Sequence, residues 1–430
     1  MLTSFKLHSL KPYSLKSSMI LEIITYILCF FSMIIAFVDN TFSIKIYNIT
    51  AIVCLVALIL RGRQENYNIK NLILPLSIFL IGLLDLIWYS AFKIDNSPFR
   101  ATYHSYLNTA KIFIFGSFIV FLTLTSQLKS KKESVLYTLY SLSFLIAGYA
   151  MYINSIHEND RISFGVGTAT GAAYSTMLIG IVSGVAILYT KKNHPFLFLL
   201  NSCAVLYVLA LTQTRATLLL FPIICVAALI AYYNKSPKKF TSSIVLLIAI
   251  LASIVIIFNK PIQNRYNEAL NDLNSYTNAN SVTSLGARLA MYEIGLNIFI
   301  KSPFSFRSAE SRAENMNLLV AEHNRLRGAL EFSNVHLHNE IIEAGSLKGL
   351  MGIISILFLY FSLFYTAYKR RALGLLILTL GIVGIGLSDV IIWARSIPII
   401  VAAASGCNDN WNAACPYDHI TESNPHNAKR

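Results

Sequence analysis

Runs of about 20 apolar residues recur along this 430-residue chain, and they constrain its fold more than any other feature. A helix of that length crosses a bilayer core, and backbone groups in lipid must satisfy their own hydrogen bonds, so each run is predicted to be a transmembrane helix. Only 13% of the residues are charged, about half the usual share in a soluble domain. The sequence therefore predicts an all-α polytopic membrane protein with 11 or 12 transmembrane helices. The approximate spans are 19–38, 42–60, 71–92, 109–125, 135–153, 171–189, 196–212, 216–232, 243–259, 348–368 and 373–387, with a twelfth beginning near Val390.

Basic residues indicate how these spans are oriented. The net charge is +14, and about half of the Lys and Arg residues lie in the N-terminal segment or in short connections at every second boundary between apolar runs. Because such connections stay on the cytoplasmic side, we expect a cytoplasmic N-terminus and a periplasmic region from about 260 to 341. No basic amphipathic stripe or nucleic-acid motif occurs, so no nucleic-acid partner is expected. The basic connections contain Lys6, Lys11, Lys16, Arg61, Arg63, Lys70, Lys129, Lys131, Lys132, Lys191, Lys192, Lys235, Lys238, Lys239, Lys369, Arg370 and Arg371.

The spans divide the chain into four predicted parts. The periplasmic connection alone is large enough to fold by itself, and helical patterns occur in it at 262–273 and 285–300. It has no net charge, so its arginines need a local explanation. We predict transmembrane helices 1–9 at 1–259, a mostly helical periplasmic loop domain at 260–341, C-terminal transmembrane helices at 342–404 and an atypical polar tail at 405–430.

The cysteines do not indicate a disulfide framework or a metal site. Cys29, Cys54, Cys203 and Cys225 all fall inside apolar spans, where cysteine behaves as a small core residue. No Cys/His cluster has the spacing of zinc ligands. We therefore expect no metal and no cofactor.

Two arginines are candidates for binding phosphate. Arg215 interrupts two apolar spans in a tight turn on the predicted periplasmic side, where arginine is disfavoured, and its planar guanidinium suits phosphate oxygens. The alternative is an interfacial arginine that extends to the lipid headgroups. Arg288 lies on the predicted helix at 285–300, where the alternative is a solvated helix face that pairs with Glu293.

One histidine is a candidate base. His338 lies in Asn334-Val-His-Leu-His-Asn-Glu340, where the periplasmic region meets the next span. Histidine titrates near neutrality and can take a proton from a hydroxyl, although a hydrogen-bonded interfacial histidine is equally compatible with this position. His336 would diverge from His338 on a helix, so the two are not expected to share a metal.

Three ionisable residues lie within apolar spans, at Lys45, Asp85 and Lys111. Such residues often have a function in membrane proteins. Because nothing in the sequence pairs them, a role in holding helices together is an equal alternative.

The order of these residues resembles the O-antigen ligase and polymerase superfamily, and most closely the enterobacterial lipopolysaccharide O-antigen ligases. An arginine at a membrane turn precedes a large loop with Ala287-Arg288 and Ser302-Pro303. The loop closes with His338-Asn339-Glu340-Ile-Ile-Glu343-Ala-Gly345-Ser-Leu-Lys-Gly349 before a span. The histidine–asparagine motif is fairly specific, whereas each arginine carries weight only in this order. The resemblance runs from Met1 to about Ile400.

The resemblance implies an inverting, metal-independent glycosyltransferase with a GT-C-like architecture in the bacterial inner membrane. Arg215 and Arg288 would bind the pyrophosphate of undecaprenyl-pyrophosphate-linked O-antigen, and His338 would be the catalytic base. The acceptor would be a hydroxyl of the lipid A–core oligosaccharide, reached from the periplasm among membrane lipids. General-base catalysis and charge-assisted hydrogen bonds to phosphate suit this reaction.

Further residues are predicted to surround the same cleft. They are Asp389, Trp393 and Arg395 near the end of the penultimate span, with His336 and Asn339 beside the base. From their charge alone, His323, Arg325 and Arg327 are predicted to contact the acidic acceptor.

The chain departs from the family pattern at its C-terminal end. Where family members complete a final apolar helix, the apolar run here stops at Ala404 and a polar segment with Cys407 and Cys415 follows. Two other activities remain open at this point. An O-antigen polymerase would need the same residues, and a transporter of lipid-linked glycans is less favoured because no internal repeat is found.

Overall fold

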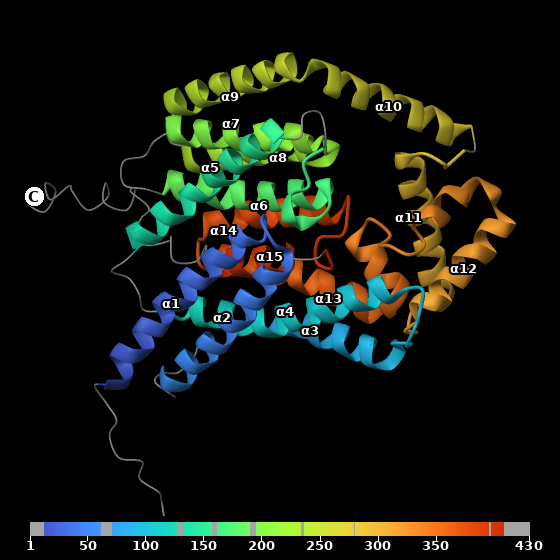
Figure 1. The fold of residues 1–430 in the computed structure, drawn as a ribbon, viewed down its shortest axis with the longest axis horizontal. Coiled ribbons are helices and arrows are strands. Elements are labelled where there is room, and N and C mark those ends of the chain that lie inside the picture. The colour runs from blue at the N-terminus through green and yellow to red at the C-terminus, as the bar shows by residue number, and fades with distance from the viewer. Residues whose placement is uncertain are drawn as a thin grey trace, which may run out of the picture.

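The computed structural model describes residues 13–61, 71–126, 132–156, 161–189, 195–233, 236–278, 280–394 and 397–407. Within these ranges the chain forms helices and no strands (Figure 1), which confirms the all-α prediction. The helices are α1 (Tyr13–Ile35), α2 (Asn40–Arg61), α3 (Ile73–Phe92), α4 (Arg100–Leu124), α5 (Lys132–Ile156), η3 (Phe164–Val166), α6 (Ala169–Leu188), α7 (Pro195–Thr212), α8 (Arg215–Tyr233), α9 (Pro237–Ile257), α10 (Asn259–Thr277), α11 (Ser284–Lys301), α12 (Ala309–Glu322), η4 (Asn324–Phe332), α13 (Glu340–Lys369), α14 (Leu373–Gly386) and α15 (Ile397–Cys407).

The chain is a multi-pass membrane protein. In its described part, ten helices are long and apolar enough to cross a membrane, namely α1 to α9 and α13. The predicted span at 373–387 is the shorter apolar helix α14, of 14 residues. The predicted twelfth span corresponds to α15, which has 11 residues and follows a non-helical segment at 387–394.

Two helices start especially far ahead of the predicted spans. The span predicted at 109–125 begins already at Arg100, and the one predicted at 348–368 begins at Glu340. In both cases the extra turns carry polar side chains that are buried against other parts of the protein, such as Tyr106 and Glu343. Hydropathy detects contact with lipid, so it misses turns that are buried by protein contacts.

Helix α6 forms the centre of the molecule, between α7 and α14 in Figure 1. Every residue of its membrane-spanning part from Gly171 onward is buried. Its small residues allow close packing, as at Gly180, where the side chain of Val205 on α7 lies directly against the backbone. The helix begins where the Thr168 hydroxyl accepts a hydrogen bond from the Gly171 amide at 3.1 Å.

The region between α9 and α13 forms a second, smaller unit. Helix α10 continues along the edge from α9 and leads to α11 and α12 at one end of the molecule (Figure 1). The helices predicted at 262–273 and 285–300 are thus confirmed as parts of α10 and α11. This unit has its own hydrophobic cluster, to which α11, α12 and η4 contribute Ala290, Met291, Ile294, Met316 and Leu326.

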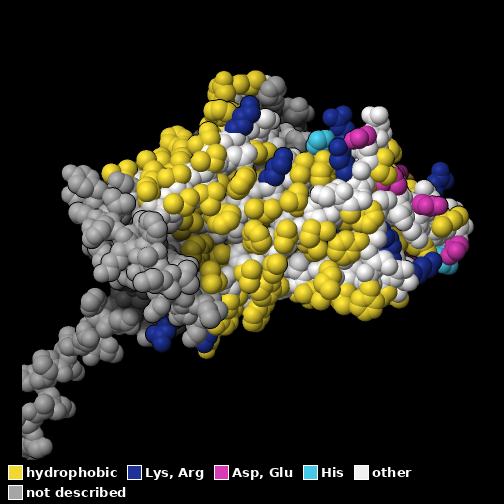
Figure 2. All heavy atoms as spheres, turned by 90° about the horizontal axis from the view of Figure 1, so that it is seen from below, with side chains coloured by type: hydrophobic (Ala, Val, Ile, Leu, Met, Phe, Trp, Pro, Cys, Tyr) yellow, Lys and Arg dark blue, Asp and Glu magenta, His cyan; other side chains and the backbone are white. Residues whose placement is uncertain are grey.

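The surface separates into an apolar middle and a charged end. Figure 2 shows hydrophobic side chains over most of the visible middle, while Asp and Glu side chains gather at the end formed by the smaller unit. Large apolar residues such as Leu219 and Ile256 are exposed, as expected for contact with lipid. Cys29, Cys54 and Cys225 are buried and Cys203 partly so, all as free thiols, which confirms their predicted place in the core.

Helix α13 contains a break at Gly349. This glycine has φ 56° and ψ −148°, a conformation that residues with a side chain rarely adopt. The freed Leu350 amide donates to the Pro303 carbonyl at 2.7 Å, and the Arg307 amide donates to the Leu347 carbonyl at 2.8 Å. The break therefore attaches the connection after α11 to the membrane helix that leads away from the predicted site.

Candidate active site

The central feature of the site is a contact between a histidine and a carboxylate from two non-helical segments. His338 lies just before α13, and Asp389 lies in the segment that joins α14 to α15. His338 Nδ1 is 2.7 Å from Asp389 Oδ1. Both residues were predicted for one cleft, and the structure places them in direct contact.

Asp389 is held in its ionised form by its surroundings. Burial raises the pKa of this carboxyl, but the His338 hydrogen bond and charge, the Tyr174 hydroxyl and the Arg288 guanidinium together outweigh burial and lower it to about 2. Tyr174 donates to Asp389 Oδ2 at 2.6 Å, and Arg288 Nη2 lies 3.9 Å from the same oxygen. Asp389 therefore carries a negative charge at neutral pH.

This charge sets the chemistry of His338. An ionised carboxylate only accepts hydrogen bonds, so the imidazole must donate from Nδ1, and in the neutral tautomer that does so the lone pair lies on Nε2. The His338 backbone has φ 51°, and its carbonyl accepts a hydrogen bond from the Tyr292 hydroxyl at 2.7 Å. A histidine in this orientation can act as a general base towards a group in the adjacent cavity.

Two buried glutamates hold the segments that carry the pair. Glu340 Oε1 accepts hydrogen bonds from the Ile391 and Ile392 amides at 3.0 and 2.9 Å, just after Asp389. Glu343 accepts from the Leu337 amide at 2.9 Å and forms a fully buried ion pair with Arg312 at 2.8 Å. Both glutamates lie in the first turn of α13, so this turn fixes both sides of the His338–Asp389 contact.

A buried ion pair supports the same region from the membrane side. Asp85 on α3 pairs with Lys348 on α13, and both side chains are completely buried. The Trp393 indole donates to the other Asp85 oxygen at 2.7 Å, and the Lys348 ammonium lies 4.3 Å from the Trp393 ring centre. Asp85 thus has a partner that the sequence did not reveal. Lys45 and Lys111 have exposed side chains.

Arg288 lies on the side of Asp389 that faces α11. The predicted alternative, a surface pair with Glu293, is wrong, because Glu293 binds the Arg325 guanidinium through both oxygens at 2.8 and 2.5 Å. Arg288 remains partly exposed, at 27% of its side-chain surface, and its charge is directed to Asp389. A site that adjoins both His338 and a guanidinium is therefore present in the structure.

Arg215 lies at the start of α8 and contacts acidic residues of α10. It pairs with Glu268 at 2.7 Å and with Asp272 at 3.5 Å. Asp272 also accepts from the Leu285 amide at 3.3 Å, one turn before Arg288, and so links Arg215 to α11. Its side chain stays 32% exposed.

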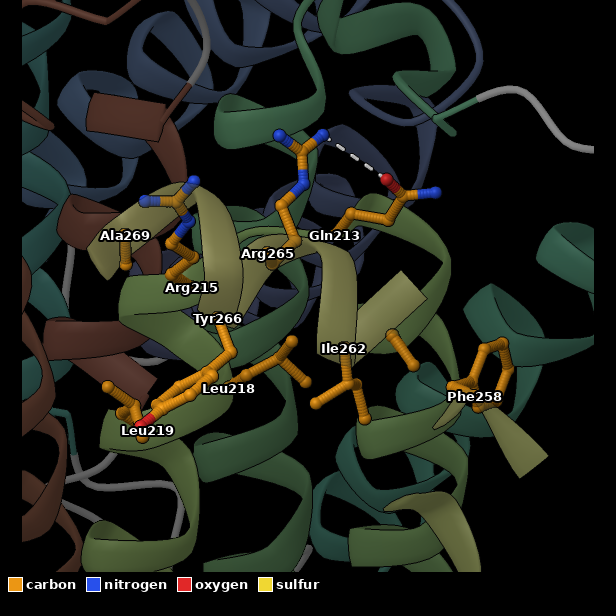
Figure 3. Close-up of a pocket in the computed structure, with 10 residues that line it drawn as sticks. Gln213, Arg215, Leu218, Leu219, Phe258, Ile262, Arg265, Tyr266 and Ala269 are labelled. Carbon is orange, nitrogen blue, oxygen red and sulfur yellow. Dashed lines mark hydrogen bonds between the residues drawn. The ribbon is translucent and has the colours of Figure 1, made fainter. Parts of the chain in front are cut away.

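Two further arginines surround Arg215. Arg265 on α10 shares Glu268 with it and donates to the Gln213 side chain at 3.2 Å (Figure 3). Arg161 donates to the Thr212 carbonyl at 3.0 Å. Partial burial, together with the positive charges of Arg265 and Arg215, lowers the pKa of Arg161. Nothing in the sequence singled out these two residues, since each is one arginine in a connection.

An apolar pocket of about 240 Å³ adjoins this arginine cluster. Figure 3 shows the polar ends of Arg215, Arg265 and Gln213 to one side of the apolar lining residues. The pocket can therefore take a molecule with an anionic head and an apolar chain. The apolar lining consists of Ala210, Leu218, Leu219, Phe258, Ile262, Tyr266 and Ala269.

A second cavity, of about 420 Å³, contains the catalytic candidates. His336, His338, Asp389 and Trp393 all line it, as predicted for a common cleft. The Asn339 side chain caps α13. Its Oδ1 accepts hydrogen bonds from the Ile341 and Ile342 amides, and its Nδ2 donates to the Leu387 carbonyl at 2.9 Å. Arg395 lies outside the described residues.

Other predicted contacts lie away from this cavity. His323, Arg325 and Arg327 are exposed at η4 and do not line the cavity. His336 is directed to Glu343 at 3.3 Å and His338 to Asp389, so the two histidines diverge. Among the residues that the structure describes, no group of three or more His, Cys, Asp or Glu side chains is placed to hold a metal ion.

Comparison with known proteins identifies the family. Over 404 residues the chain is 97% identical to an O-antigen ligase of Escherichia coli strain K12, which covers 94% of this chain and 96% of that protein. The chain belongs to the O-antigen ligase family. A family model described as O-antigen ligase matches residues 200–357. An uncharacterized protein of Haemophilus influenzae is 25% identical over 252 residues, or 56% of this chain and 61% of its own length.

Membership of the O-antigen ligase family supports the predicted activity over the polymerase and the transporter. The protein is a glycosyltransferase-type enzyme of lipopolysaccharide biosynthesis that acts on O-antigen and lipid A–core. The matched segment 200–357 contains Arg215, Arg288 and His338, whereas Asp389 lies beyond it.

Sequence reasoning missed several residues of this candidate site. Tyr174 and Tyr292 lie in helical runs where tyrosine is common, and their partners are distant in the sequence. Glu340 and Glu343 were visible in the motif after His338, and a buried acidic pair at a helix start could have indicated a role.

Proposed function

We propose that His338 and Asp389 activate the acceptor hydroxyl, while Arg288 and Arg215 bind the pyrophosphate of the donor. The reaction is the transfer of O-antigen from undecaprenyl pyrophosphate to a hydroxyl of the lipid A–core oligosaccharide. The observation that carries the proposal is the 2.7 Å contact of His338 with Asp389, beside which Arg288 lies at 3.9 Å.

The proposed step is a single displacement. His338 Nε2 takes the proton of the acceptor hydroxyl, whose oxygen forms a bond to the anomeric carbon of the donor sugar. The bond from that carbon to the pyrophosphate oxygen breaks, and the pyrophosphate leaves with the electron pair, so the anomeric configuration inverts. Asp389 stabilises the imidazolium that forms, in the manner of other histidine–carboxylate pairs. A positioned base contributes about 10²- to 10⁴-fold to the rate.

The donor is proposed to lie across the arginine side of the site. Guanidinium groups form bidentate, charge-assisted hydrogen bonds with phosphate oxygens, and they supply the positive charge that the leaving pyrophosphate needs. Glu268 and Asp272 orient Arg215 while a third of its surface stays open to a ligand. The adjoining apolar pocket is suited to the first isoprene units of the lipid (Figure 3).

The proposed location is the periplasmic face of the inner membrane, with a cytoplasmic N-terminus. The alternation of basic connections supports this orientation, because it leaves the region between α9 and α13 on the other side. His338 and Arg288 both belong to that region. The orientation places the site where a lipid-linked glycan and the lipid A–core can meet.

The test is complementation of a strain that lacks its ligase. We expect the parent chain to restore the lipopolysaccharide ladder on a gel, and His338→Ala and Arg288→Ala to lose it at equal membrane levels. Arg215→Ala should weaken the ladder at low donor supply. Lys301→Ala, an exposed residue at the end of α11, is the matched control and should behave like the parent. A full ladder from well-expressed His338→Ala would refute the proposed base.

A further inference from the structure

The last turns of α11 and the connection that follows them expose three large apolar side chains. Leu296 and Ile300 lie one turn apart on the same face of α11, and Phe304 follows four residues later in the connection to α12. Their exposed fractions are 47%, 68% and 79%. Apolar groups that gather on a surface in this way mark a place of interaction. We call these three residues the α11 wedge.

The connection that carries Phe304 is attached to two membrane helices. The Leu350 amide of α13 donates to the Pro303 carbonyl at 2.7 Å, and the Trp88 indole of α3 donates to the Arg307 carbonyl, also at 2.7 Å. Trp88 lies one turn before the end of α3, within a helix that is apolar enough to cross the membrane. In Figure 1 the end of α11 that is farther from α10 accordingly lies beside the ends of α3 and α13. The wedge is therefore at the level where the membrane helices end, not out in water.

The wedge continues a surface that already faces lipid. Just after Leu350, α13 exposes Met351, Ile354 and Leu357, which are three residues apart and belong to one side of a membrane-spanning helix. Pro303 contacts Leu350, so Phe304 and Met351, their neighbours in the chain, begin the two apolar surfaces from one shared contact. The lipid that covers this side of α13 is thus the nearest apolar medium for the wedge.

We propose that the α11 wedge inserts into the leaflet on the side of the smaller unit and contacts the acyl chains of its lipids. Large apolar side chains gain free energy when they leave water, and helices with an exposed apolar face bind at the membrane interface for this reason. The smaller unit is then held by the bilayer as well as by its contacts with α3 and α13. Its partner on this face is a lipid surface.

The wedge is distinct from the candidate active site. Ile300 lies about 18 Å along α11 from Arg288, at roughly 1.5 Å per residue. Neither cavity of the site contains a residue of the wedge in its lining. The inference therefore goes beyond the proposed function, and it stands or falls separately from the roles of His338 and Arg288.

The experiment places a tryptophan in the wedge and measures which quencher reaches it. Phe304→Trp is made in the full-length chain, which is purified into nanodiscs whose lipids carry bromine on their acyl chains. Leu318→Trp on α12 is the matched control. Leu318 is also exposed, at 59%, but it lies between Glu314 and Glu322, which are exposed four residues to either side. It thus represents an apolar residue on a charged, solvated face.

The two reporters should respond in opposite ways. We expect the emission added by Phe304→Trp to be shifted to shorter wavelength and to lose most of its intensity in brominated discs, while iodide in the buffer leaves it unchanged. The emission added by Leu318→Trp should be quenched by iodide and not by brominated lipid. The parent chain is measured alongside and its signal is subtracted, because it contains Trp88, Trp393 and Trp411.

Three results would overturn the proposal. Quenching of Phe304→Trp by iodide would place the wedge in water. Protection from both quenchers would show that protein covers it, and persistence of this protection only in discs that hold two chains would identify a second copy as the cover. Equal quenching of the two reporters by brominated lipid would show that lipid contact is not specific to the wedge. Should Phe304→Trp fail to fold, Ile300→Trp gives the same readout.

Discussion

Replacing Asp389 by asparagine tests the central contact of the site. Asparagine has nearly the same shape, so its Oδ1 can still accept from His338 Nδ1, but the negative charge is lost. In the structure this charge faces His338 at 2.7 Å, and the Tyr174 hydroxyl holds the same carboxylate at 2.6 Å. The change therefore removes the stabilisation of the imidazolium and leaves the geometry in place.

The size of the expected effect follows from that contact. A hydrogen bond to a charged group contributes about 1.5–3 kcal/mol. If this amount is realised only when His338 is protonated in the transition state, kcat falls about 10- to 160-fold, since about 1.4 kcal/mol is a factor of ten. In His338→Ala, kcat should fall further, by about 10²- to 10⁴-fold, because the base itself is absent.

The assay is transfer of O-antigen to lipid A–core by the purified chain, with kcat and both KM values determined. We expect Asp389→Asn to lower kcat while both KM values stay within about twofold, which separates this role from an effect through Arg288 on donor binding. Because Asp389 is proposed to act through His338, the double variant should be no slower than His338→Ala alone. A parental kcat in Asp389→Asn, or losses that multiply in the double variant, would refute the reasoning.

Three further changes test the parts of the fold that hold this site. Asp85→Ala leaves Lys348 buried and unpaired, so the free energy of unfolding should fall by about 3–5 kcal/mol, seen as a lower midpoint of denaturation in detergent. Gly349→Ala adds a side chain at a positive φ and should lower the apparent Tm, whereas Gly148→Ala, with open space around it, should not. Asn339→Ala removes the cap of α13, should cost about 1 kcal/mol, and should speed hydrogen exchange in its first turn.

For each of these three predictions, one outcome would contradict its physical explanation. A double change of Asp85→Leu with Lys348→Met should recover much of the lost stability, and no recovery would mean that the ion pair is not the cause. Equal Tm values for the two glycine variants would show that the break in α13 is not needed. Unchanged exchange in Asn339→Ala would show that the cap is supplied elsewhere.

The sequence predicted the transmembrane helices well because lipid imposes a direct constraint on composition. It failed at the ends of α4 and α13, where residues such as Tyr106 and Glu343 are buried by protein contacts. The span predicted at 373–387 corresponds to α14, but the next span was expected to begin near Val390, whereas residues 387–394 are non-helical and α15 begins only at Ile397. Hydropathy does not show such an interruption, since the segment around Asp389 is itself apolar.

For the site, the sequence predicted individual residues from their type and order, but it did not predict which of them are in contact. His338 stood out in a motif and Arg288 only through the order of the residues, and the structure brings both to Asp389. The pairing itself was not readable, because His338 and Asp389 are 51 positions apart and Tyr174 is 215 positions from Asp389. Arg215 was also predicted as a single residue. Its acidic partners on α10 were not predicted, because they meet it only in the folded chain.

The Glu340 side chain links the start of α13 to the non-helical segment between α14 and α15. It begins α13 just after His338, and it accepts from the amides just after Asp389. A change in how α14 and α15 pack would therefore move Asp389 and His338 as one body, with their separation preserved. The lining of the two pockets away from this contact can then change, while the distance between His338 Nδ1 and Asp389 Oδ1 stays constant.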